Sequence, residues 1–114
     1  MSSKKKFLVL GATGMLGNAV FRVLSEDSRL QVFGTVRRKE ARCFFISELA
    51  SRLIVLKNIE CQDELDELFI SLCPEIVINC IAERKPTTSD VIKSIKIYSL
   101  LPHRLGHMCR LHGA

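Results

Sequence analysis

The chain has 114 residues, of which 47% are hydrophobic, and this length and composition suit one compact domain rather than two. Seventeen Lys and Arg against twelve Asp and Glu leave a formal net charge of +5. That charge allows nucleic acid, anionic lipid or a phosphate-bearing small molecule as partners. No apolar run approaches the ~18 residues of a membrane span, and the run at 7–10 is too short for a signal peptide, so we expect no membrane partner.

Strand-like and helix-like stretches alternate along the chain. We expect a solvated leader at 2–6, then strands at 7–10, 31–36, 53–56 and 75–81, separated by helices at 15–24, 43–50 and 63–72 and followed by a helical region at 90–111. Pro74 ends the third helix, and Pro102 predicts a kink or a break near Leu101. This alternation predicts right-handed βαβ units and a doubly wound parallel sheet of about four strands with helices on both faces.

Three glycines stand where the first predicted strand passes into the first helix, in the stretch GATGMLG from Gly11 to Gly17. Gly11 permits a tight turn, Gly14 lets a pyrophosphate approach the backbone, and Gly17 lets the helix pack closely on the strand. The N–H groups near Met15 and Leu16, with the positive end of the helix dipole, favour an anion. We therefore predict a phosphate-binding loop, with the crevice between Gly11 and Asn79 as the place of the ligand.

The context of the glycines favours a dinucleotide over other phosphate ligands, because they follow a strand and open a βαβ unit. A nucleoside-triphosphatase is disfavoured, since its loop ends in Gly-Lys-Ser/Thr whereas this one ends in Gly17-Asn18-Ala19. The alternative in which the glycines serve only the turn and the packing stays open.

The glycine spacing resembles that of the extended short-chain dehydrogenase/reductase family, and within it the dTDP-4-dehydrorhamnose reductase group. The stretches GATGMLG, VFGTVRR, PEIVINCIAERK and SLLPHRLGHMCRLHGA look like successive landmarks of that group. The resemblance implies the N-terminal part of an NAD(P)-binding Rossmann domain over 1–114, from a reductase of nucleotide-linked 4-keto sugars. The cofactor-binding residues it implies in the loop are Gly11, Thr13, Gly14, Met15, Leu16 and Gly17.

The second predicted strand ends in Arg37 and Arg38. An NAD site usually carries Asp or Glu there to accept from the ribose 2′-OH, whereas a 2′-phosphate attracts arginine. The basic pair favours NADP over NAD. Because Lys39 and Arg42 continue the charge, a solvated basic surface loop is the alternative.

The resemblance implies further cofactor contacts after the third and fourth strands. It places Glu60 near the adenine, while Asp63 is expected to be the N-cap of its helix. It also places Cys80, Ile81 and Ala82 along the ribose and the phosphates, with ordinary packing at a strand end as the alternative.

The catalytic Tyr-x-x-x-Lys of the family is not found in this sequence. Tyr98 is the one tyrosine and Pro102 stands four residues later; the group usually has Asn at position 98. We therefore expect no catalytic residue, no substrate-binding domain and no reductase activity in this chain. The chain is then either a fragment of a sugar-nucleotide reductase, which its end before the expected fifth strand favours, or a stand-alone nucleotide-binding or interaction module.

The strand from Glu75 to Ile81 would lack a neighbour on its far side in such a chain. Unpaired backbone groups at a sheet edge template pairing with another chain, so we predict self-association or a partner chain along this strand.

Other constellations are weaker. The five cysteines form no Cys-x-x-Cys pair, which is typical of free thiols in the cytoplasm. His103 and His107 could share a helix face for zinc, but no nearby carboxylate completes a ligand set, so we expect no metal. Nucleic-acid binding is the competing class, although the basic residues are scattered and only 6% of the residues are aromatic.

Overall fold

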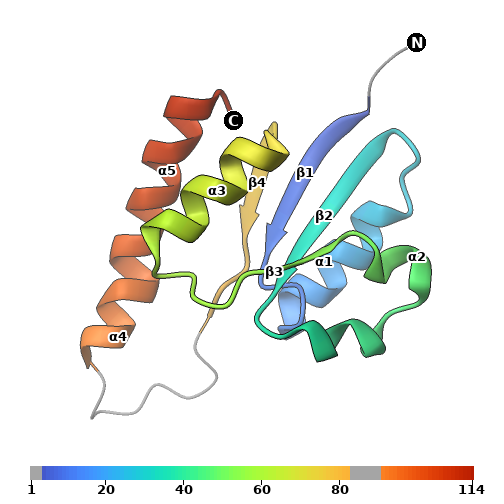
Figure 1. The fold of residues 1–114 in the computed structure, drawn as a ribbon, viewed down its shortest axis with the longest axis horizontal. Helices are drawn as coiled ribbons and strands as arrows, with labels where there is room; N and C mark the ends of the chain where they lie inside the picture. The colour runs from blue at the N-terminus through green and yellow to red at the C-terminus, as the bar shows by residue number, and fades with distance from the viewer. Residues whose placement is uncertain (1–3, 83–90) are drawn as a thin grey trace.

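The computed structural model describes residues 4–82 and 91–114, and strands and helices alternate along the chain (Figure 1). The strands are β1 (Lys5–Leu10), β2 (Leu30–Val36), β3 (Leu53–Val55) and β4 (Ile76–Asn79). The helices are α1 (Met15–Ser25), α2 (Ser47–Ala50), α3 (Gln62–Leu72), α4 (Val91–Ile95) and α5 (Leu101–His112), with a 3₁₀ helix at Lys39–Phe44 and a π-helical turn at Lys96–Leu100. Position 90, where the last helical region was expected to begin, lies outside the described residues.

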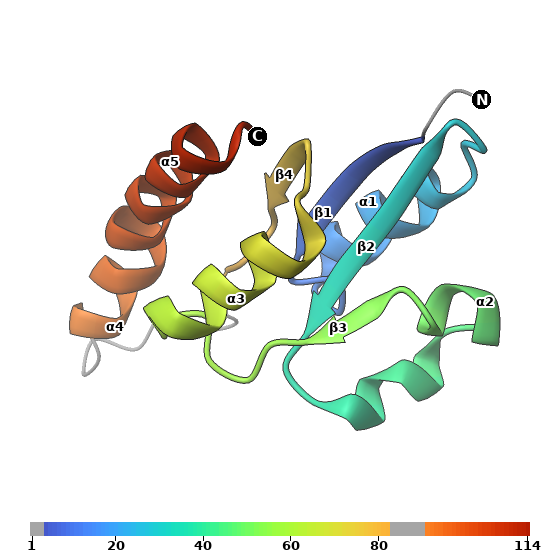
Figure 2. The ribbon, with the colours of Figure 1, turned by 45° about the horizontal axis from the view of Figure 1, so that its top comes forward.

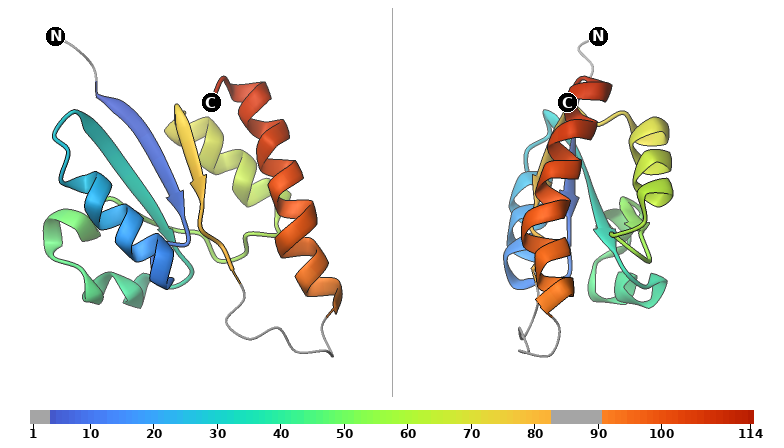
Figure 3. Two further views of the ribbon diagram at one scale, coloured as in Figure 1. Left: turned by 180° about the vertical axis from the view of Figure 1, so that it is seen from behind. Right: turned by 90° about the vertical axis from the view of Figure 1, so that its left-hand side faces the viewer.

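The strands form one parallel sheet in the order β3-β2-β1-β4. The chain runs outward from β1 to β3 and then crosses back, so that β4 pairs with the free side of β1 and Asn79 lies beside Leu10. Seen edge-on in Figure 3, α1 and α3 lie on opposite sides of the sheet. The predicted doubly wound α/β fold is therefore confirmed, and its switch point lies between β1 and β4.

Two apolar clusters hold the layers together, because alternate residues of β1 point to opposite faces. Leu8 and Leu10 belong to the cluster that α3 and α5 cover, while Val9 belongs to the cluster that contains Phe21 of α1. In Figure 2, α5 lies beside α3 beyond β4. Both faces of β1 are thus buried, which explains its continuous apolar run.

The prediction of a single helix over 43–50 is wrong. The chain instead makes the 3₁₀ helix, passes through an extended residue at Phe45 and then forms α2. The Phe45 ring is buried edge-on against Phe21, with ring centroids 5.7 Å apart, and the guanidinium of Arg22 lies 4.6 Å from its centroid. Burying this ring in the core interrupts the helical path.

Several boundaries also differ from the prediction. The N-cap of α3 is Cys61 rather than Asp63, which lies in the first helical turn, where its carboxylate still opposes the helix dipole. Lys5 and Lys6 belong to β1 rather than to a solvated leader, and Lys6 Nζ donates to the Leu72 carbonyl over 3.2 Å. The strand expected at 75–81 is shorter, because only Ile76–Asn79 pairs with β1.

The last helical region does not break near Leu101, because Leu100 and Leu101 both have helical backbone angles, but its hydrogen-bonding pattern changes there. A π-helical turn at Lys96–Leu100 leads into α5, where Pro102 lies in the first turn. Because proline has no N–H to donate four residues back, the regular α-helical bonding pattern cannot run through this position.

None of the described helices has the length and apolar character needed to cross a membrane.

Candidate functional site

The glycine loop joins β1 to α1 at the carboxyl edge of the sheet, and two of its glycines are required by the backbone. Gly11 has a φ of +82°, in the left-handed region, and a Cβ there would lie 3.2 Å from the Cys80 carbonyl oxygen. A Cβ on Gly17 would overlap the Gly11 carbonyl oxygen and would stand 3.3 Å from Cys80 Cβ. The first turn of α1 is thus pressed against both the loop and the end of β4.

Gly14 differs from the other two glycines because the fold does not require it. Its φ of −70° is accessible to any residue, and a Cβ there would meet only the Gly11 carbonyl oxygen, 3.6 Å away. Gly14 is the N-cap of α1 and provides no side-chain cap, so the N–H groups of the first helical turn have no partner from the cap. Gly14 and Met15 are exposed, so they form an open helix N-terminus of the kind that binds anions.

The residues after β4 lie against this loop. The Cys80 N–H donates to the Leu10 carbonyl over 3.0 Å, and the Ile81 N–H donates to the Asn79 side chain over 3.0 Å. A Cβ on Gly11 would come within 3.1 Å of Ile81 Cδ1. Burial raises the pKa of the Cys80 thiol, so this side chain is a neutral lining group rather than a thiolate nucleophile at neutral pH. The structure thus brings Cys80 and Ile81 to the glycine loop, with exposed Ala82 following them.

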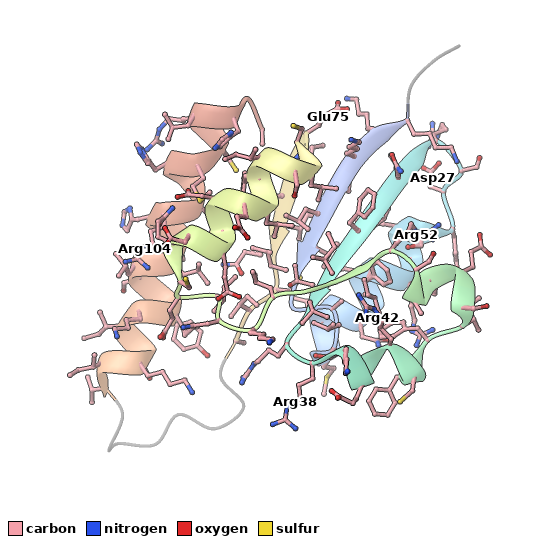
Figure 4. The ribbon with its side chains drawn as sticks, viewed as in Figure 1. Asp27, Arg38, Arg42, Arg52, Glu75 and Arg104 are labelled. Atoms are coloured by element: carbon pink, nitrogen blue, oxygen red, sulfur yellow. The ribbon has the colours of Figure 1, made fainter. Side chains whose placement is uncertain are left out.

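The arginine pair follows directly from the end of β2, next to β1 in the sheet. Arg37 and Arg38 are both exposed, and Arg38 projects from the carboxyl edge of the sheet in Figure 4. Arg42 is engaged elsewhere, because its Nη2 donates to the Leu53 carbonyl of β3 over 2.8 Å. The basic loop therefore contains a pair of exposed guanidinium groups on the edge that also bears the glycine loop.

Glu60 follows β3, two strands away from β1 in the sheet order. Its backbone is fixed at both ends, because its N–H donates to Asn58 Oδ1 over 3.0 Å and its carbonyl accepts from Arg104 Nη1 over 3.0 Å. Thr13 is exposed at the tip of the glycine loop. Glu60 therefore lies on the connection from β3 to α3, where α5 holds its carbonyl.

Two residues of β2 contact the glycine loop but were not among the residues predicted from the sequence. The Thr35 hydroxyl accepts from the Gly11 N–H over 3.0 Å. A Cβ on Gly34 would lie 2.9 Å from Ala12 Cβ and 3.0 Å from Phe21 Cδ2. A glycine inside a strand pattern signals such a close approach, so Gly34 could have been found, whereas nothing in the sequence distinguishes Thr35.

A concavity of about 420 Å³ lies between α3 and α5, away from the glycine loop. It is lined by Gln62, Asp66, His103, Arg104, His107, Met108 and Leu111. Within residues 4–82 and 91–114, no three His, Cys, Asp or Glu side chains are grouped as a metal site.

A parallel sheet whose switch point bears a glycine loop and an uncapped helix N-terminus defines a Rossmann-type domain of the NAD(P)-binding class. The chain belongs to the NAD dependent epimerase/dehydratase family, whose model matches residues 7–114. The comparison with curated proteins gives no match.

Solved structures of this class share the fold at low sequence identity. The dTDP-4-dehydrorhamnose reductase of Bacillus anthracis, solved with NADP, is 18% identical with a TM-score of 0.72, and the match covers 100% of this chain and 35% of that one. The enzyme WbmH of Bordetella bronchiseptica, solved with NAD⁺, is 17% identical with a TM-score of 0.72, covering 96% and 36%. A short-chain dehydrogenase of Leptospira borgpetersenii with bound NAD⁺ is 19% identical with a TM-score of 0.68, covering 93% and 44%. The chain thus spans less than half the length of each of these three enzymes.

Proposed function

We propose that this chain binds NADP, with the pyrophosphate on the glycine loop and the 2′-phosphate at Arg37, assisted by Arg38. The observation that carries the proposal is the N-terminus of α1, which has no side-chain cap and begins at an exposed glycine. The N–H groups and the positive end of the helix dipole favour a bound phosphate there. Under this proposal Cys80, Ile81 and Ala82 line the ribose and phosphates, and the loop around Glu60 holds the adenine.

The choice of NADP over NAD depends on the arginine pair. Changing Arg37 and Arg38 together to glutamine removes both guanidinium groups and keeps side chains of similar length. We expect NADPH to bind about tenfold to a hundredfold more weakly, since a charge-assisted hydrogen bond contributes about 1.5–3 kcal/mol, while NADH binding stays unchanged. Calorimetric titration of both cofactors measures the ratio.

Lys96→Gln combined with Arg110→Gln is the matched control, because both residues are exposed and lie in the last helical region. This control also removes two positive charges, without touching the proposed site. An equal loss of NADPH affinity in the control variant would attribute the effect to overall charge and would contradict the arginine assignment.

The wider proposal is that the chain forms the cofactor-binding part of a reductase acting on nucleotide-linked 4-keto-6-deoxy sugars. The resemblance in the stretches after each strand supports it, together with the fold shared with the NADP-bound reductase. The cofactor would supply the hydride, while this chain's residues bind and orient it. We propose that these residues do not catalyse the reduction on their own, and that the five free thiols belong to a cytoplasmic protein.

A second proposal concerns the outer edge of β4, along which we expect this chain to pair with a second copy or another strand. Among the described residues β4 pairs with β1 alone, and Ile76 in it is 37% exposed. An edge strand with an exposed apolar side chain favours pairing.

The Ile76→Lys variant tests that edge, because a charge on an edge strand opposes pairing. We expect wild-type protein to increase in mass with concentration in light scattering, and Ile76→Lys to stay monomeric. Ile70→Lys on α3 is the control, since Ile70 is also exposed. A wild-type protein that is monomeric at every concentration would remove the proposal.

A further inference from the structure

Thr35 is the one buried polar residue of the described chain, with 3% of its surface exposed. It lies in β2, next to the point where β1 passes into the glycine loop. Its hydroxyl accepts from the Gly11 N–H over 3.0 Å, and its carbonyl accepts from the Ala12 N–H over 2.9 Å. One residue of β2 thus holds the two consecutive N–H groups with which the glycine loop begins.

These two hydrogen bonds act at the most constrained point of the loop. Gly11 already has a positive φ of +82°, and its carbonyl oxygen lies where a Cβ on Gly17 would stand. A shift of Gly11 would therefore move the first turn of α1.

We propose that Thr35 is a positioning residue that fixes the glycine loop in the geometry that receives the pyrophosphate. The proposal rests on the proposed dinucleotide function of the loop. Thr35 does not touch the ligand, and it acts through the Gly11 N–H. It also stands two residues before Arg37, so the same strand end supports the loop for the pyrophosphate and the loop for the 2′-phosphate.

Two ligands distinguish the effect of Thr35 on the glycine loop from its effect on the arginine loop. NADPH contacts both loops, whereas 2′-AMP has no pyrophosphate and needs only the arginine loop. Thr35→Val keeps the size and branching of the side chain but removes the acceptor, and Thr35→Ser restores it. We expect Thr35→Val to weaken NADPH by about tenfold, Thr35→Ser by no more than about twofold, and neither to change 2′-AMP.

Amide hydrogen exchange gives a readout that needs no ligand. The Gly11 amide should be protected in the wild-type protein and in Thr35→Ser, and should exchange faster in Thr35→Val. Ser25→Ala is the control, because the buried Ser25 hydroxyl has no hydrogen-bond partner among residues 4–82 and 91–114, and its removal should change neither quantity.

The outcomes distinguish this proposal from the function on which it rests. If wild-type protein fails to bind NADPH, the proposed function fails, whereas exchange at Gly11 still tests the hydrogen bond. Unchanged protection of Gly11 in Thr35→Val would overturn the positioning role. Lost protection with unchanged NADPH binding would overturn it as well, and so would an equal loss of NADPH and 2′-AMP affinity, because that pattern indicates general unfolding.

Discussion

Gly14→Ala is expected to weaken NADPH binding by about a hundredfold while leaving the fold intact. Under the proposed function, the added methyl group stands between the pyrophosphate and the backbone N–H groups at the start of α1. Losing two charge-assisted hydrogen bonds of about 1.5–3 kcal/mol each corresponds to that factor or more. Titration calorimetry with NADPH measures the loss.

The same variant should unfold at a denaturant concentration close to that of the wild-type protein. The φ of −70° at Gly14 suits alanine, and the nearest atom to the new Cβ is 3.6 Å away. An alanine that fits its backbone stabilises by about 0.4–1 kcal/mol, because it restricts the unfolded chain, but alanine is a poorer N-cap than glycine, which offsets this gain. Gly106→Ala in α5 is the control, with its nearest atom 4.0 Å away, and should gain stability without losing NADPH. Wild-type affinity in Gly14→Ala would mean that no phosphate approaches the loop here.

Gly17→Ala, unlike Gly14→Ala, is expected to lower the free energy of unfolding. Its Cβ would overlap the Gly11 carbonyl oxygen and lie 2.8 Å from the Gly11 carbonyl carbon, and these backbone atoms cannot rotate away as a side chain would. Overpacking of this kind costs about 1–3 kcal/mol, and contacts with backbone belong at the upper end. Urea unfolding followed by circular dichroism measures the shift in midpoint.

The comparison of the two variants separates packing from binding. A Gly17→Ala protein as stable as the wild type would show that the loop and α1 can move apart. The close approach at Gly11 and Cys80 would then not define the site.

The sequence predicted the order of elements and the position of the glycine loop between β1 and α1, because both depend on local signals. The apolar run of β1, the spacing of Gly11, Gly14 and Gly17 and the stripe of α1 are each contained in a few consecutive residues. Parallel strands then bring their carboxyl ends to one edge, so the vicinity of Cys80 to Gly11 also followed from topology.

What the sequence did not predict depends on contacts between distant residues. Thr35 lies 24 residues from Gly11, and its hydroxyl is paired only because β2 lies beside β1. Phe45 interrupts the expected helix because its ring packs against Phe21, a residue of another element. Such contacts between separate elements override the local periodicity.

The affinity of the wild-type chain for NADPH tests the central claim most directly. Calorimetry with NADPH, NADH and 2′,5′-ADP should show NADPH and 2′,5′-ADP binding at one site, with NADH at least about tenfold weaker, as the loss of one charge-assisted hydrogen bond implies. Equal affinities for NADPH and NADH would contradict the role of Arg37. No binding of any of the three, together with salt-sensitive binding to DNA, would contradict the whole account and assign the positive charge to nucleic acid.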